Sequence, residues 1–113
     1  MLGFVQAPYP GSEAWLLNTV ATVGPTTIGF NVMRSFMNYK SGIYSESSCT
    51  TSSSNYLGGH AVTVIGYGTS GSTAYWLIRN SWGNTWGESG YFKMARNANN
   101  MCGLATYATY PTI

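Results

Sequence analysis

The sequence is poor in charge and contains no aspartate. Only 7% of its 113 residues are charged, and all three acidic residues are glutamates. A Ser-His-Asp triad therefore cannot be assembled from this chain alone. The positive charges are scattered along the chain, which argues against a nucleic-acid-binding stripe. They belong to Arg34, Lys40, Arg79, Lys93 and Arg96.

Long apolar runs are also missing. No stretch approaches the ~20 consecutive apolar residues that a membrane-spanning helix needs. Residues 1–10 lack a basic leader followed by a long apolar stretch, so we do not expect Met1 to begin a secretory signal. The sequence therefore predicts neither a membrane partner nor a nucleic-acid partner.

Cysteine is scarce as well, with only Cys49 and Cys102 in the chain. Neither belongs to a CxxC motif for metal binding or redox chemistry. Two interpretations follow from the residues alone: a pair of free thiols, or one disulfide that clamps a loop in an oxidising compartment. Their spacing does not decide between the two, because bridging depends on the geometry of the fold.

Aromatic residues and glycine are abundant. Aromatics make up 15% of the chain, and there are fourteen glycines. This composition predicts a β-rich, turn-rich globular unit of at most one domain. Ser12 and Glu13 favour the start of one main helix near residues 12–23. The chain is therefore predicted to be α+β, with that helix and several antiparallel strands. We expect a short helical turn at 35–42, a polar loop at 49–59, strands at 26–32, 61–67, 74–80 and 91–96, and an extended segment at 104–113.

The only histidine, His60, follows Gly58 and Gly59 and opens an apolar, β-branched run. A lone histidine is often a structural residue, and that interpretation stays open. The two glycines nevertheless allow a ligand close to the backbone or a positive φ. A rigid strand end would also hold an imidazole well for general-base chemistry.

A catalytic histidine needs a group that orients its second ring nitrogen. Without an aspartate, Asn80 is the best candidate, because it follows the strand that returns beside His60 after the predicted hairpin. Trp82 or Trp86 could shield the contact from water. As isolated residues, Asn80 would be a turn residue and the tryptophans ordinary packing aromatics.

Longer motifs around these residues resemble those of the papain-like cysteine peptidases. GGHAVTVIGYG (58–68) and YWLIRNSWGNTWGESGYFKMAR (75–96) are similar to the family's His-Ala-Val strand and its Asn-Ser-Trp-Gly loop. The segments at 23–32, 41–49 and 99–111 are similar to the family's Val-Gly-Pro, Ser-Gly-Ile-Tyr and Cys-Gly…Tyr-Pro segments. The resemblance runs from about Glu13 to Pro111. It implies that residues 1–113 are the right-hand, β-rich half of the catalytic domain, a mostly antiparallel sheet or barrel.

The resemblance also implies roles for single residues. His60 would be the catalytic imidazole that pairs with a cysteine thiolate, and Asn80 would orient it. Trp82 would cover their hydrogen bond.

Other positions would line the cleft or support it. Gly58 and Gly59 would lie beside the substrate. Gly29 and Tyr107 would shape the pocket for the substrate's second residue from the cut. Cys49 and Cys102 would form the family's disulfide in this half. The resemblance implies no metal or cofactor. The partners would be a peptide or protein substrate and the missing N-terminal half-domain, and the whole protein would be lysosomal or extracellular.

The family's nucleophile is not matched. It lies in a Cys-Gly-Ser-Cys-Trp type segment over a hundred residues before the histidine, whereas 59 residues precede His60 here. We therefore expect an N-terminal half-domain elsewhere to carry the nucleophile, and this chain alone to be inactive. The residues after Met1 resemble mid-protein sequence. Two alternatives remain: a non-peptidase relative with a replaced nucleophile, or a short binding or structural half-domain.

Overall fold

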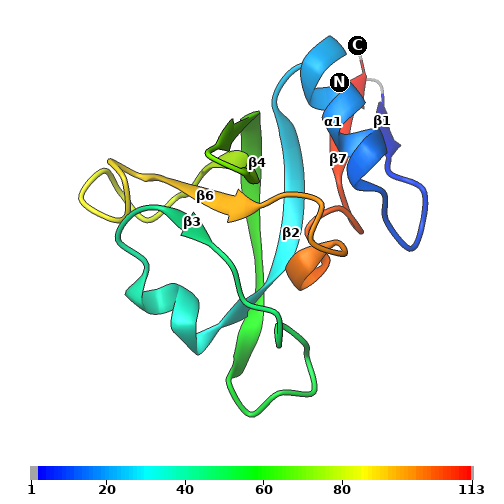
Figure 1. The fold of residues 1–113 in the computed structure, drawn as a ribbon. Helices are drawn as coiled ribbons and strands as arrows, with labels where there is room; N and C mark the ends of the chain where they lie inside the picture. The colour runs from blue at the N-terminus through cyan, green and yellow to red at the C-terminus, as the bar shows by residue number, and fades with distance from the viewer. Residues whose placement is uncertain (1–2, 113) are drawn as a thin grey trace.

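A computed structural model describes residues 3–112 of the chain. Met1, Leu2 and Ile113, which the predicted unit of 1–113 includes, lie outside the described residues. Seven strands form one sheet in the order β1-β7-β2-β4-β5-β6-β3, all pairs being antiparallel except β3–β6 (Figure 1). The elements are β1 Gly3–Gln6, α1 Glu13–Thr22, β2 Thr26–Met33, η1 Arg34–Asn38, β3 Ile43–Tyr44, β4 Tyr56–Ser70, β5 Thr73–Arg79, β6 Tyr91–Ala95, η2 Met101–Gly103 and β7 Thr109–Thr112.

The main helix begins where the sequence predicts it. Ser12 is the N-cap, and its hydroxyl accepts a hydrogen bond of 3.0 Å from the Trp15 backbone N–H. Glu13 in the first turn does more than favour the helix dipole. Its carboxylate accepts hydrogen bonds from the Trp76 indole and from the backbone N–H groups of Asn97 and Asn100. The helix start is thereby tied to β5 and to the loop before η2.

Three segments differ from their predicted form. The helical turn expected at 35–42 is the 3₁₀ helix η1, which ends at Asn38. β4 begins at Tyr56 rather than at residue 61, because Gly58 and Gly59 still pair with β2. Residues 104–107 are a turn rather than an extended segment, and only 109–112 form a strand. Backbone N–H groups of this segment donate hydrogen bonds to the loop before it, from Leu104 to the Met101 carbonyl and from Ala105 to the Asn100 side chain, and these bonds hold it as a turn.

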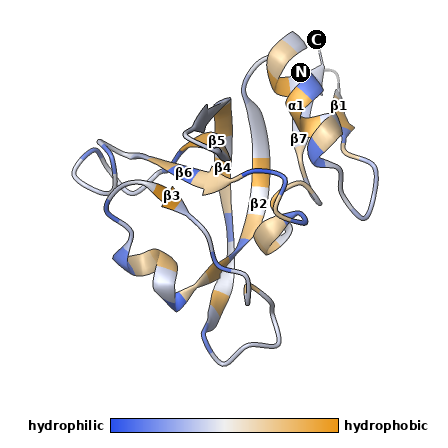
Figure 2. Cartoon of the chain, viewed as in Figure 1, coloured by the Kyte–Doolittle hydropathy of each residue, from blue (hydrophilic) through white to orange (hydrophobic). Residues whose placement is uncertain are grey.

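The core lies on one side of β2 and β4. Ile28, Phe30, Val62 and Val64 are buried there, and Leu16 of α1 is buried with them. Figure 2 shows hydrophobic stretches on both α1 and β2, the elements that enclose this part of the core. Among residues 3–112, no helix is long and apolar enough to cross a membrane.

The opposite side of β2 and β4 carries small or polar residues. Alternate positions of β2 pair with alternate positions of β4, and their side chains face away from the core because strand side chains alternate. None of these residues is buried, so this face of the sheet is open to solvent. The pairs are Thr27–Thr63, Gly29–Ala61 and Asn31–Gly59.

Candidate active site

His60 and Asn80 are brought together by the β4–β5 pair. His60 lies within β4, and Asn80 directly follows the last residue of β5. The His60 Nε2 and the Asn80 Oδ1 are 2.8 Å apart. Asn80 is 7% exposed, whereas His60 is half-buried. The contact therefore has a protected acceptor and a ring that still reaches solvent.

The hydrogen bonds of Asn80 fix the direction of its amide group. Its Oδ1 also accepts a hydrogen bond of 2.8 Å from the Ser81 backbone N–H, which can only donate. The atom facing His60 is therefore an acceptor oxygen, so the His60 Nε2 must carry the proton. In a neutral ring this leaves Nδ1 unprotonated and able to accept a proton.

Trp82 packs over the imidazole. The two ring centroids are 5.0 Å apart at an interplanar angle of 23°, a stacked arrangement. Trp86 does not stack on His60; it meets Trp82 edge-on at 5.1 Å. Of the two tryptophans that could shield the histidine, Trp82 is thus the one in contact with it. Phe36 supports both indoles, at 5.6 and 5.3 Å.

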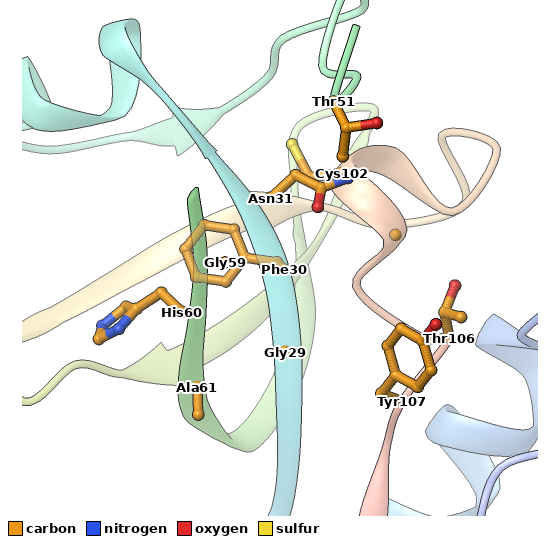
Figure 3. A pocket seen from close by; sticks show the side chains of 11 residues that line it. Gly29, Phe30, Asn31, Thr51, Gly59, His60, Ala61, Cys102, Thr106 and Tyr107 are labelled. Atoms are coloured by element: carbon orange, nitrogen blue, oxygen red, sulfur yellow. The ribbon is translucent and has the colours of Figure 1, made fainter. Parts of the chain in front are cut away.

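A hollow of about 540 Å³ lies beside His60 on the open face of β2 and β4. Figure 3 shows His60 and Tyr107 at its two sides, with Gly29 and Ala61 between them. Tyr107 is 62% exposed. Gly29, Gly59 and Tyr107 thus lie together with His60, although they come from three segments of the chain.

Gly58 is not among the lining residues. Its φ of 139° is in the region that favours glycine, and it lies one residue before Gly59 in β4. The sequence analysis did not foresee several lining residues: Phe30, Asn31, Thr51, Ala61, Cys102, Gly103 and Thr106. Asn31 and Ala61 could have been found from their two-residue spacing after Gly29 and Gly59, but the others carry no such local signal.

Cys49 and Cys102 form the disulfide that the resemblance implied, with Cα atoms 5.0 Å apart. It joins the Ser/Thr-rich loop before β4 to the loop at η2. Because Thr51 and Cys102 both line the hollow, the bridge holds two walls of the hollow together.

A polar network lies behind the tryptophans. Glu88 accepts hydrogen bonds from the Gly42 backbone N–H at 2.7 Å and from the Lys93 ammonium at 3.1 Å. Burial opposes ionisation of Glu88, but these two donors and the Lys93 charge outweigh it, so its pKa is below the usual value. Burial is the main reason that the pKa of Tyr39 is raised to about 12. The Tyr39 and Trp86 ring centroids are 5.5 Å apart, so this network contacts the aromatic rings around His60 through Tyr39.

Known proteins are similar to this chain in both sequence and fold. The family model described as "Papain family cysteine protease" matches residues 2–112. A digestive cysteine proteinase 1 of Homarus americanus is 47% identical over 91% of the chain, and cathepsin L of Sarcophaga peregrina is 47% identical over 98%. The structure of the digestive procathepsin L2 proteinase from Tenebrio molitor larval midgut superimposes with a TM-score of 0.86 at 42% identity, over 100% of this chain and 34% of its own.

The chain spans about a third of the length of these relatives, 31% and 32% for the two sequences. The match covers the helix, the sheet, the disulfide and the loop that carries Asn80 and Trp82. The shared segment is therefore long and continuous rather than a single motif. The chain belongs to the papain family of cysteine proteases, and it is cathepsin L-like.

Proposed function

We propose that this chain is the histidine- and asparagine-bearing part of a cysteine-type endopeptidase. The nucleophilic cysteine would belong to an N-terminal half-domain outside these residues, as in the family. The observation that carries the proposal is the hydrogen bond from His60 Nε2–H to Asn80 Oδ1 beneath Trp82. It leaves the His60 Nδ1 available to a thiol.

The tautomer suggests how the two residues would act. The His60 Nδ1 would take the proton from the cysteine thiol, giving a thiolate and an imidazolium. The thiolate would attack the peptide carbonyl carbon, and the imidazolium would return the proton to the leaving amine. Water, deprotonated by His60, would then hydrolyse the thioester. Asn80 would keep the ring in one orientation, and Trp82 would keep water from their hydrogen bond.

The hollow beside His60 would receive a peptide side chain. Gly29 and Gly59 place no side chain in it, and a Cβ added to Gly59 would meet no atom within 4 Å. Tyr107 would bound the far side and bring a phenol oxygen to an otherwise largely apolar wall. Gly58 would act indirectly, by giving the backbone next to His60 its conformation.

The remaining properties follow the family. The chemistry needs no metal or cofactor, because thiolate and imidazole carry out every step. The disulfide Cys49–Cys102 is consistent with an oxidising compartment, and we expect the complete protein to be lysosomal or extracellular. The 5′ end of the native transcript should encode a Cys-Gly-Ser-Cys-Trp-like segment. A serine at the nucleophile position would instead indicate a non-peptidase relative, and a true start at Met1 a binding or structural half-domain.

The roles of the two residues can be tested in the complete protein. His60→Ala should abolish hydrolysis of a fluorogenic peptide, while Asn80→Ala should lower kcat by about tenfold or more without abolishing it. The matched control is Asn84→Ala, because Asn84 is exposed and in the same loop. Wild-type turnover in the His60 variant would remove His60 from the mechanism. An unchanged rate and pH profile in the Asn80 variant would refute its orienting role.

A further inference from the structure

The chain from 97 to 102, which follows β6 and enters η2, has an unusual backbone conformation. Within residues 3–112, five non-glycine residues have a positive φ, and four of them lie in this stretch: Asn97, Asn99, Asn100 and Cys102. Asparagine tolerates this left-handed region, but cysteine rarely adopts it, and Cys102 has φ 59° and ψ 17°. Backbone strain of this kind persists only where surrounding contacts hold it, and it is concentrated at functional sites.

This stretch leads into one wall of the hollow beside His60. Figure 3 shows Thr106 and Tyr107 across Gly29 from His60. The lining residues that follow Asn100 along the chain form what we call the η2 wall: Cys102, Gly103, Thr106 and Tyr107. The contacts that hold the stretch therefore also decide where this wall lies.

Glu13 of α1 holds the beginning of the stretch. Its Oε1 accepts a hydrogen bond of 2.9 Å from the Asn97 backbone N–H, and its Oε2 accepts one of 3.0 Å from that of Asn100. Backbone N–H groups that converge in a left-handed turn favour an anion, and here a carboxylate of the same chain supplies it.

Asn100 extends this hold to the η2 wall. Its Oδ1 accepts a hydrogen bond of 2.7 Å from the Ala105 backbone N–H, and its Nδ2 donates one of 3.0 Å to the Thr106 hydroxyl. Its backbone carbonyl accepts a third, of 2.9 Å, from the Gly103 N–H. A Cβ added to Gly11 would lie 2.8 Å from Asn100 Nδ2 and 2.9 Å from Thr106 Cα. The segment before α1 thus packs directly on these residues.

We propose that Glu13 and Asn100 are positioning residues that set the width of the hollow, and so determine which peptide side chain it accepts. The proposal rests on the proposed function, in which the hollow receives a substrate side chain. Neither residue lines the hollow, so both act through the η2 wall. Loss of their hydrogen bonds would let this wall leave its strained conformation and weaken its contact with a bound side chain. The bonds of His60 and Asn80 with each other do not involve either residue.

The test compares two peptide substrates in the complete protein, with phenylalanine or alanine as the second residue before the cut. Asn100→Gly removes both side-chain bonds but keeps a residue that adopts a positive φ without strain. Glu13→Gln turns one acceptor oxygen into a donor group. In both variants KM for the phenylalanine substrate should rise about tenfold, comparable to the effect of one methylene in a pocket. The control is Asn99→Gly, because Asn99 is exposed and has a similar φ of 58°.

The second substrate separates positioning from general stability. KM for the alanine substrate, and kcat for both, should stay within about twofold, because a methyl group is too short to depend on the η2 wall. An equal loss for the two substrates, or a loss in kcat alone, would overturn the proposal. So would an unchanged KM for the phenylalanine substrate in either variant.

A readout without catalysis is amide hydrogen exchange in the ¹⁵N-labelled 113-residue chain. In Asn100→Gly the Ala105 N–H loses its acceptor and should exchange about tenfold faster, while the amides of β4 and β5 keep their rates. Equal acceleration throughout the chain, or no acceleration at Ala105, would overturn the proposal. The two proposals fail separately: a protein without peptidase activity can still show faster exchange at Ala105, and an active one can keep an unchanged KM.

Discussion

Phe36 is the side chain on which the aromatic cluster around the site depends most. Its ring is 0% exposed and contacts six other aromatic rings at centroid distances of 4.8 to 6.2 Å. They belong to Phe30, Tyr39, Tyr44, Trp82, Trp86 and Phe92. Because η1 follows β2 directly and places Phe36 in the core, Phe36 connects the sheet with the loop that carries Trp82 and Trp86.

Replacing Phe36 with alanine should therefore cost stability as well as local order. A buried Phe→Ala change loses about 3–5 kcal/mol, from lost transfer energy and the cavity left behind. Six ring contacts place Phe36 at the upper end, so we expect about 4–5 kcal/mol. A domain of this size has a total stability of about 5–15 kcal/mol, and the variant would be marginal.

The assay is urea unfolding of the 113-residue chain with its disulfide intact, followed by tryptophan fluorescence and by near-ultraviolet circular dichroism. Met37→Ala is the matched control, because Met37 is the next residue in η1 and is 50% exposed. Its stability should change by no more than about 0.5 kcal/mol. The Phe36 variant should also lose the near-ultraviolet signal of the packed indoles, since Trp82 and Trp86 lose a shared neighbour.

A loss below about 1 kcal/mol for Phe36→Ala, with an unchanged slope against urea, would refute this reasoning. It would mean that the neighbouring rings fill the space left by Phe36 without a loss of stability. A large loss in both variants would instead point to η1 itself, rather than to the Phe36 ring.

Three further predictions concern the Cys49–Cys102 disulfide, the Glu88 carboxylate and the hollow beside His60. Replacing Cys49 and Cys102 by serine opens a loop with a sequence separation of 53 and should cost about 4 kcal/mol in urea unfolding; a loss under 1 kcal/mol would contradict this. Because the folded pKa of Glu88 is lowered from 4.5, its contribution is present above pH 4.5 and is lost as pH falls through the folded value. In Glu88→Gln the free energy of unfolding should therefore decrease less as pH falls. An unchanged decrease would show that the contacts of Glu88 with Lys93 and its other neighbours contribute nothing to stability. Gly59→Val should leave unfolding nearly unchanged but raise KM for peptides in the complete protein, because the new side chain enters the hollow; an unchanged KM would exclude substrate from that space.

The sequence was informative wherever structure is decided by near neighbours. The Ser12 cap and Glu13 predicted the start of α1, and β-branched residues predicted the strand after His60. The beginning of that strand was missed, because Gly58 and Gly59 are poor strand formers in isolation. Only pairing with β2 makes them part of β4, and pairing between distant segments is invisible in local propensity.

The candidate site likewise contains some residues that the sequence predicted and others that it did not. The positions of His60, Asn80 and Trp82 could be inferred from motifs, because each motif keeps its order and spacing along the chain. The wall formed by Thr51 and Thr106 could not be inferred, because no local pattern marks residues that meet only after the sheet and the loops have assembled.

By itself, the sequence determined the family, the α+β class and the main helix, and it predicted the pair of residues that we propose to support a thiolate. These depend on residue types and short spacings, which can be read directly from the amino-acid sequence. Only the tertiary structure decided that the Asn80 oxygen faces the imidazole, and that the Asn80 nitrogen has no partner among the described residues. Those facts depend on distances and directions between atoms that are far apart in the chain, and packing sets them.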